Sequence, residues 1–210
     1  MNLRERFHGL DKNRQALMLA AIWMLLGSLL WIWWDERTLP DVGGHWSSRG
    51  CETVRSVVGV SRLKRDLRLD ESSWRLKVDF YGDADCTKGL FSVETEGPYR
   101  LGPKSFEPRD ATLIRFDLGK LTLTPDAPEA AAKFDQARCG DGNWKVGEGQ
   151  EVTQEGCLGL VPTLDTCPAE YDIVKIQDGA LYLGDRSLGL CEPDRYPVTF
   201  APAPLEKIIE

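Results

Sequence analysis

The chain has 210 residues, 28% of them charged, and a formal net charge of −7 from 26 Lys and Arg against 33 Asp and Glu. An acidic chain without a basic block lacks the cations that neutralise phosphates, so nucleic acid is excluded as an expected partner. The length leaves room for one ordinary domain beside a terminal segment.

The first feature along the chain is an uncharged apolar stretch at residues 16–34, ALMLAAIWMLLGSLLWIWW. As an α-helix this stretch would be about 28 Å long, close to the hydrocarbon thickness of a bilayer. It exceeds the apolar core of a cleavable signal peptide, and the charged sequence DERTLPD follows it in place of a small-residue cleavage site. We therefore predict a transmembrane helix at 16–34, in preference to a signal peptide or a buried core helix.

The charges on either side of this stretch predict its orientation. Basic residues lie in the preceding segment 1–15, whereas Asp35 and Glu36 follow the span. The positive-inside rule then makes 1–15 a cytoplasmic tail, and the rest of the chain lies outside. We expect a single-pass protein of the cell (inner) membrane, with a tether at 35–43 and a periplasmic or extracellular C-terminal domain.

The sequence after the tether has the apolar and polar alternation of β-strands. The clearest case is 67–80, where a turn separates two alternating runs. Similar alternation occurs at 90–95, 112–124, 171–176 and 180–184. Strands with two unlike faces need a shared interior, which predicts a mainly β domain.

One short helix is predicted in this domain, at 124–140. Thr124 can cap it and Pro125 suits its first turn. A single short helix among many antiparallel strands indicates a sandwich or a barrel, and we favour a lipocalin-like antiparallel barrel at 44–202 because closure removes exposed edge strands. Residues 203–210 are expected to form a C-terminal tail.

The apolar faces of the strands are the candidate ligand-contacting surface. In a narrow barrel they fill the interior, and in a wider one they line a cavity; periodicity does not separate the two. Trp46 lies in a Gly-x-Trp arrangement also seen in lipocalin-like barrels, where the indole plugs the closed end, with ligand contact as the alternative. The candidate lining residues are Trp46, Leu67, Leu69, Trp74, Leu76, Val78, Phe80, Phe91, Val93, Ile114, Phe116 and Leu118.

The sequence contains no recognisable catalytic or metal-binding pattern. His45 is the single histidine after the span, and the serines lack a Gly-x-Ser-x-Gly elbow. Asp83 and Asp141 lie in oxygen-rich turns without EF-hand spacing, and Cys-x-x-Cys is absent. We therefore predict a protein that is not an enzyme and uses no metal and no cofactor.

All of the cysteines follow the predicted span, as expected for disulfides in an oxidising compartment. Six cysteines allow 15 pairings, and the residues alone leave the choice open. They are Cys51, Cys86, Cys139, Cys157, Cys167 and Cys191.

Several segments in fixed order resemble a known family. GHWSSRGCE at 44–52 is similar to the His-Trp-x-Ser-x-x-Cys-Glu motif that begins the repeats of the adenomatosis-polyposis-coli-down-regulated (APCDD) domain family. The resemblance continues through WRLKVDFYGDADCTKGLFSVETEGPYRL (74–101) and LTPDAPEAAAKFDQARCGDGNWKVGEGQEVTQEGCLGL (123–160). EYDIVKI (170–176) and YLGDR (182–186) complete it.

This resemblance implies a β-barrel with an apolar pocket for lipid, because animal members are membrane-tethered Wnt antagonists thought to capture an acyl chain. It also implies the disulfides Cys51–Cys86 and Cys139–Cys157, which leaves Cys167 to pair with Cys191. The single copy, the N-terminal span and the absence of Asn-x-Ser/Thr sequons depart from the animal pattern and favour a prokaryotic envelope protein. Wnt antagonism is therefore not carried over.

We expect a membrane-anchored barrel that binds a lipid or other acylated ligand without catalysis. The alternative is a protein-interaction module with a solid barrel core and an envelope protein as its partner. An internal cavity favours the first function, and an exposed apolar patch without a cavity favours the second.

Overall fold

The computed structural model describes residues 21–24, 39–56, 59–157, 159–187 and 189–209. Of the predicted transmembrane helix, only residues 21–24 are described, and these are helical. The predicted cytoplasmic tail and most of the predicted tether lie outside the described residues. Within the described ranges, no helix has both the length and the apolar character needed to cross a bilayer.

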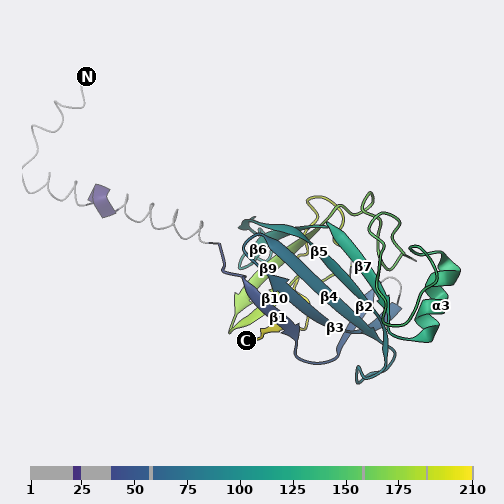
Figure 1. Cartoon of the computed structure of the whole chain (residues 1–210). Coiled ribbons are helices and arrows are strands. Elements are labelled where there is room, and N and C mark those ends of the chain that lie inside the picture. Colours follow the sequence, from purple (N-terminus) through teal and green to yellow (C-terminus); the bar gives the residue numbers. More distant parts are fainter. Residues whose placement is uncertain (1–20, 25–38, 57–58, 158, 188, 210) are drawn as a thin grey trace, which may run out of the picture. The chain divides into compact units, whose positions relative to one another are not determined.

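The chain divides into two compact units, Met1–Leu39 and Pro40–Glu210, and the second contains the domain described below. Its elements are drawn in Figure 1 and are β1 (Gly44–Ser48), β2 (Glu52–Ser56), β3 (Gly59–Leu69), β4 (Ser73–Tyr81), β5 (Gly89–Lys104), β6 (Thr112–Asp117), β7 (Lys120–Pro125), α3 (Pro128–Ala137), β8 (Gln150–Glu151), β9 (Ala169–Gln177), β10 (Ala180–Leu183) and β11 (Leu205–Lys207).

Eight of these strands form a closed antiparallel barrel. The pairing runs from β1 to β3, β4, β5, β6, β9, β10 and β11, and β11 pairs again with β1. Strand β2 adds to β3, while β7 and β8 extend from β5. The prediction of a mainly β, closed antiparallel barrel with one short helix is confirmed.

Alternation along each strand separates the barrel interior from its surface. On β6, Ile114 and Phe116 are buried, whereas the intervening Arg115 forms an ion pair with Asp117 at 2.6 Å. Gly97 of β5 lies where a Cβ would come within 2.1 Å of the Asp117 carbonyl oxygen, so only glycine permits this close approach of the β6–β7 hairpin.

The C-terminal boundary of the domain differs from the prediction. Leu205–Lys207, placed in a tail at 203–210, forms β11, and Leu205 is fully buried. The Ile208 amide also donates to the His45 carbonyl oxygen at 2.8 Å. A three-residue strand after a proline-rich segment has too little alternation to be recognised from sequence. At the other end, Val42 of the predicted tether is buried in the core.

The helix is shorter than predicted, because α3 begins at Pro128. Thr124 and Pro125 instead pair with β5 as part of β7, and the helix N-terminus has no side-chain cap. Phe134 of α3 packs edge-on against Phe91, with 5.7 Å between ring centroids. Figure 1 shows α3 at the outside of the barrel, beyond β7.

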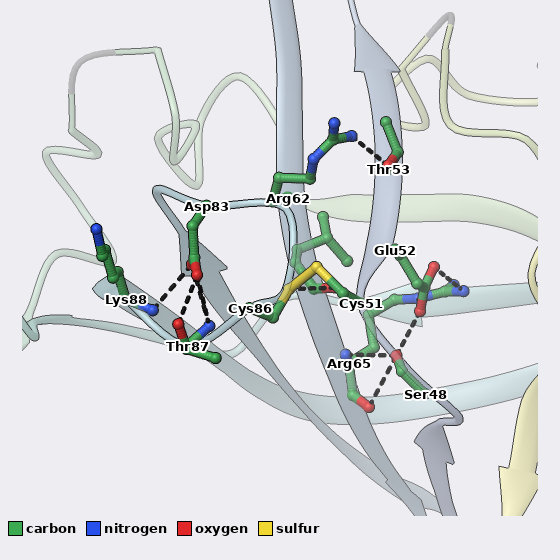
Figure 2. Close-up of a disulfide and its surroundings, with 11 residues drawn as sticks. Ser48, Cys51, Glu52, Thr53, Arg62, Arg65, Asp83, Cys86, Thr87 and Lys88 are labelled. Atoms are coloured by element: carbon green, nitrogen blue, oxygen red, sulfur yellow. Dashed lines mark hydrogen bonds and ion pairs between the residues drawn. A yellow bond between two sulfur atoms is a disulfide. The ribbon is translucent and has the colours of Figure 1, made fainter.

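The two disulfides implied by the resemblance, Cys51–Cys86 and Cys139–Cys157, are present, and the remaining cysteines form Cys167–Cys191 as expected. The first joins the start of β2 to the turn between β4 and β5 (Figure 2). The second joins the end of α3 to the segment after β8, and the third joins the start of β9 to the segment after β10. Each therefore fixes a connection against the barrel.

A buried ion pair lies beside the first disulfide (Figure 2). Arg65 alternates with Leu63 and Leu67 on the buried face of β3. Its Nε and Nη2 donate to the two carboxylate oxygens of Glu52 at 3.0 and 2.8 Å, and Nη2 also donates to the Ala203 carbonyl oxygen. The two side chains are only 8% and 9% exposed, so each charge offsets the free-energy cost of burying the other.

If β11 closes the barrel, Leu205→Ala should lower the free energy of unfolding by about 2–5 kcal/mol, because it leaves a hole in a fully buried site. The matched control is Ile209→Ala, four residues on and 94% exposed, which should change stability by less than about 0.5 kcal/mol. Urea unfolding of both variants measures the difference. Equal effects would mean that 205–210 is the tail predicted from sequence.

Arg65→Met should destabilise the chain by about 3–5 kcal/mol, because it leaves the Glu52 carboxylate buried without its counter-ion. The double variant Arg65→Met, Glu52→Leu should recover most of this loss, since it removes both charges. Urea unfolding of the two variants tests the pair. A double variant no more stable than the single one would show that Glu52 is not the group that needs Arg65.

Candidate functional site

The described part of the chain contains an apolar cavity of about 140 Å³. Its walls come from the inner faces of β4 and β5, from Leu118 and Leu121 of the β6–β7 hairpin, and from the segment 160–162. Six of the predicted lining residues line it, namely Trp74, Leu76, Val78, Phe80, Val93 and Leu118. Thr95, Leu121, Leu160, Val161, Pro162, Glu170 and Arg186 complete the lining.

The pairing of β4 with β5 positions the residues that form one apolar wall of the cavity. The alternate β4 residues from Trp74 to Phe80 all line the cavity, and Val78 lies opposite Val93 across the ladder. Trp74 and Leu76 are buried, whereas Val78 and Phe80 are only half-buried. The packing of the interior is therefore incomplete toward the second half of β4.

The other six predicted residues do not line this cavity. Trp46, Leu67, Leu69, Ile114 and Phe116 are buried in the core, and Trp46 Nε1 donates to the Val42 carbonyl oxygen at 2.9 Å. Phe91 stacks on Phe80 with ring centroids 4.6 Å apart. Strand alternation gives the same inward direction to all of the twelve except Leu118, which lies between β6 and β7, but facing side chains fill most of the interior of a small barrel.

The segment 160–162 forms the wall that the sequence analysis did not predict. Cys157 and Val161 exchange two backbone hydrogen bonds, at 2.9 and 3.1 Å, and Cys157 is bonded to Cys139. Gly156 adopts a φ of +63°, and a Cβ there would lie 2.6 Å from the Val161 carbonyl oxygen. The disulfide and this glycine therefore hold the wall against the barrel. Only the apolar character of LGLVP could have indicated it.

Two charged residues, Glu170 and Arg186, line the otherwise apolar cavity. Arg186 Nη2 lies 3.1 Å from Glu170 Oε2 and 3.5 Å from Asp172 Oδ2. The register of β9 on β6 sets Glu170 opposite Phe116 and Asp172 opposite Ile114, so both carboxylates share the side of the sheet that holds buried apolar residues. We call Glu170, Asp172 and Arg186 the polar cluster.

Asp172 is the buried member of the polar cluster. Its side chain is fully buried, and one carboxylate oxygen accepts from the Ile173 and Gly184 amides at 2.7 and 2.8 Å. Burial raises the pKa of Asp172 above its ordinary value, while Arg186 and the two amides oppose that shift. A Cβ at position 184 would lie 2.4 Å from this carboxylate, so glycine is needed for the contact.

The other residues considered for chemistry have local partners. His45 Nε2 lies 2.7 Å from Asp66 Oδ2, and the Ser47 hydroxyl donates to the Arg65 carbonyl oxygen. The Asp83 carboxylate accepts from the amides of Thr87 and Lys88 in a turn (Figure 2), and the Thr87 hydroxyl bond lowers the pKa of Asp83. Among the described residues, no three His, Cys, Asp or Glu side chains are placed to hold a metal ion.

The model of the family described as Adenomatosis polyposis coli down-regulated 1 matches residues 35–154 of the chain. This range is more than half of the sequence and contains β1 to β8 together with α3. The resemblance inferred from the sequence motifs is confirmed. The match ends before Glu170, so the polar cluster lies beyond it.

Gly184→Ala should destabilise the chain by about 1–3 kcal/mol, because the added methyl group overlaps the Asp172 carboxylate and the Pro197 ring. Gly50→Ala is the control, since a Cβ there meets nothing within 4 Å, and it should change stability by less than about 1 kcal/mol. Thermal unfolding measures both. A stable Gly184→Ala variant would contradict the close contact described here.

Proposed function

Since the chain belongs to the Adenomatosis polyposis coli down-regulated 1 family, we propose that its barrel binds the apolar chain of a lipid or of another acylated ligand, without catalysis. The observation that carries this proposal is the cavity bounded by β4, β5 and the segment 160–162. Apolar walls with few polar groups are typical of sites for small apolar ligands. Binding of this kind needs no nucleophile, acid or metal.

The size of the cavity limits how much of an acyl chain it can hold. An engineered apolar cavity of about 150 Å³ binds one benzene molecule, so a cavity of about 140 Å³ accommodates roughly six carbons. Burial of six methylene groups contributes about 5 kcal/mol before ordering costs. We therefore propose that one end of an acyl chain occupies the cavity, and that a longer insertion requires the segment 160–162 to move.

The location that we propose is the outer side of the cell (inner) membrane, with the barrel in the periplasm or extracellular space. The predicted span at 16–34 would anchor it, and the part of the predicted tether before the buried Val42, residues 35–41, would reach at most about 25 Å when extended. This tether would hold the cavity at a high effective concentration beside its lipid source. The disulfides support an oxidising compartment.

A protein-interaction module with a solid barrel is the second candidate function. It is favoured by the burial of Ile114, Phe116 and other predicted lining residues in the core, and by two exposed apolar side chains. Phe106 is 86% and Ile209 is 94% exposed. In that case an envelope protein would bind the outer surface, and the interior would only support the fold.

Quenching of Trp74 fluorescence separates these functions, because Trp74 lines the cavity. Methyl 6-bromohexanoate, a six-carbon acyl chain with a terminal bromine, should quench the full-length disulfide-bonded chain saturably, in the millimolar range once ordering costs are included. Trp74→Phe should remove the saturable part of the signal, which assigns it to this residue.

Val78→Phe should weaken this binding at least about fivefold, because the larger ring occupies part of the cavity. Val198→Phe is the matched control, since Val198 is 59% exposed and does not line the cavity. Circular dichroism checks that both variants are folded. Unchanged binding by Val78→Phe, or no saturable quenching of the unmodified chain, would overturn the proposal and favour the solid barrel.

A further inference from the structure

We infer that the polar end of the ligand is an acyl ester, whose uncharged carbonyl oxygen accepts a hydrogen bond from Arg186 Nε, and that Glu170 and Asp172 discriminate against a free carboxylate. This inference rests on the proposed function, because it assumes that an acyl chain enters the cavity. It goes further in naming the chemical class of the ligand and the residues that select it.

The first observation is an unsatisfied donor at the cavity. Arg186 lines the cavity, and its Nε is buried with no hydrogen-bond partner among the described residues. Its Nη2 forms ion pairs with Glu170 and Asp172, although Glu170 Oε2 itself accepts no hydrogen bond among the described residues. A buried N–H without an acceptor is costly and rare in folded proteins, so a ligand that supplies one acceptor atom would be stabilised there.

The geometry of these contacts favours a single acceptor over a carboxylate. A carboxylate binds arginine best through two parallel N–H groups. Nη2, the natural second donor beside Nε, is committed to the two acidic side chains. An ester carbonyl requires only one donor and leaves the existing ion pairs intact.

The charge around the cavity also favours an ester over a carboxylate. Glu170 and Arg186 are the only titratable side chains that line the cavity in the described part of the chain, and Asp172 contacts the same guanidinium. The polar cluster therefore has a net charge of −1, or zero when Asp172 is protonated. A carboxylate ligand would add a further negative charge beside Glu170, whereas an ester adds none.

The cavity and the adjoining Arg186 together limit the form of the ligand. The cavity holds roughly six carbons, and Arg186 belongs to its lining. A ligand with its carbonyl at Arg186 and an acyl chain of about six carbons would therefore accept from Arg186 and fill the cavity at the same time. Such an ester is present in glycerolipids and in acylated hydroxyl groups of proteins.

The test compares methyl 6-bromohexanoate with 6-bromohexanoate at pH 7, by quenching of Trp74 in the full-length disulfide-bonded chain. Because any apolar cavity favours the uncharged probe, the decisive quantity is the ratio of the two affinities and its change in Glu170→Gln. This variant removes one negative charge and keeps the shape of the side chain. The ester-to-acid ratio should fall at least about fivefold, mainly through tighter binding of the acid.

Glu148→Gln is the matched control, since this glutamate is 65% exposed on the surface and does not line the cavity. Its ester-to-acid ratio should equal that of the unmodified chain. Arg186→Lys should weaken ester binding about tenfold, because lysine has no Nε–H at the same place. If Arg186→Lys fails to fold, the ester-to-acid ratio of Glu170→Gln still tests the inference, because that variant retains the guanidinium.

An unchanged ratio in Glu170→Gln would overturn the inference and leave the polar cluster a structural ion pair, with the proposed function intact. Failure of both probes to bind the unmodified chain would overturn the proposed function and this inference together. Dihexanoylphosphatidylcholine and an O-hexanoylserine peptide, added as competitors, distinguish the lipid source from the protein source. Displacement by either supports an ester ligand, and displacement by neither overturns it.

Discussion

The pairing of β1 with β11 is the constraint on which the rest of the domain depends. It joins residues near the two ends of the compact unit, with Trp46 opposite Lys207 and Ser48 opposite Leu205, and so converts a row of strands into a closed barrel. Closure gives every strand an inner and an outer face and removes the edges at which an open sheet associates. The buried layer inside the barrel, which includes Trp46, Leu67 and Ile114, depends on this closed surface.

The two groups of charged residues around Arg65 and Arg186 differ in whether the guanidinium Nε has a hydrogen-bond acceptor. Arg65 donates from Nε and Nη2 to the Glu52 carboxylate, and from Nη2 to the Ala203 carbonyl oxygen. Arg186 also faces carboxylates, but its Nε has no acceptor among the described residues, and it lines a cavity. Buried polar groups are normally satisfied, so the group that is not is the better candidate for contact with a ligand.

Sequence reasoning predicted those features that depend on short-range patterns. Alternation on β4 and β6 identified the inward residues correctly. The family resemblance supplied two disulfides, and the two cysteines left over gave the third. Sequence reasoning failed at β11, where three residues carry too little pattern. The strand predicted at 171–176 is present as β9, but Tyr171, Asp172, Ile173 and Val174 are all buried, so alternation did not separate its two faces. Which inward residues line the cavity depends on how the segment 160–162 covers the barrel, and no local pattern encodes that contact.

We propose that the barrel encloses part of an acyl ester. Native mass spectrometry of the full-length chain, purified with its disulfides intact from a host that exports it, tests this claim most directly when followed by organic extraction of the same sample. We expect one bound ester lipid per protein molecule, released on unfolding and recovered in the extract. A chain that has the mass of the bare polypeptide, and that keeps this mass after incubation with ester lipids, would contradict it.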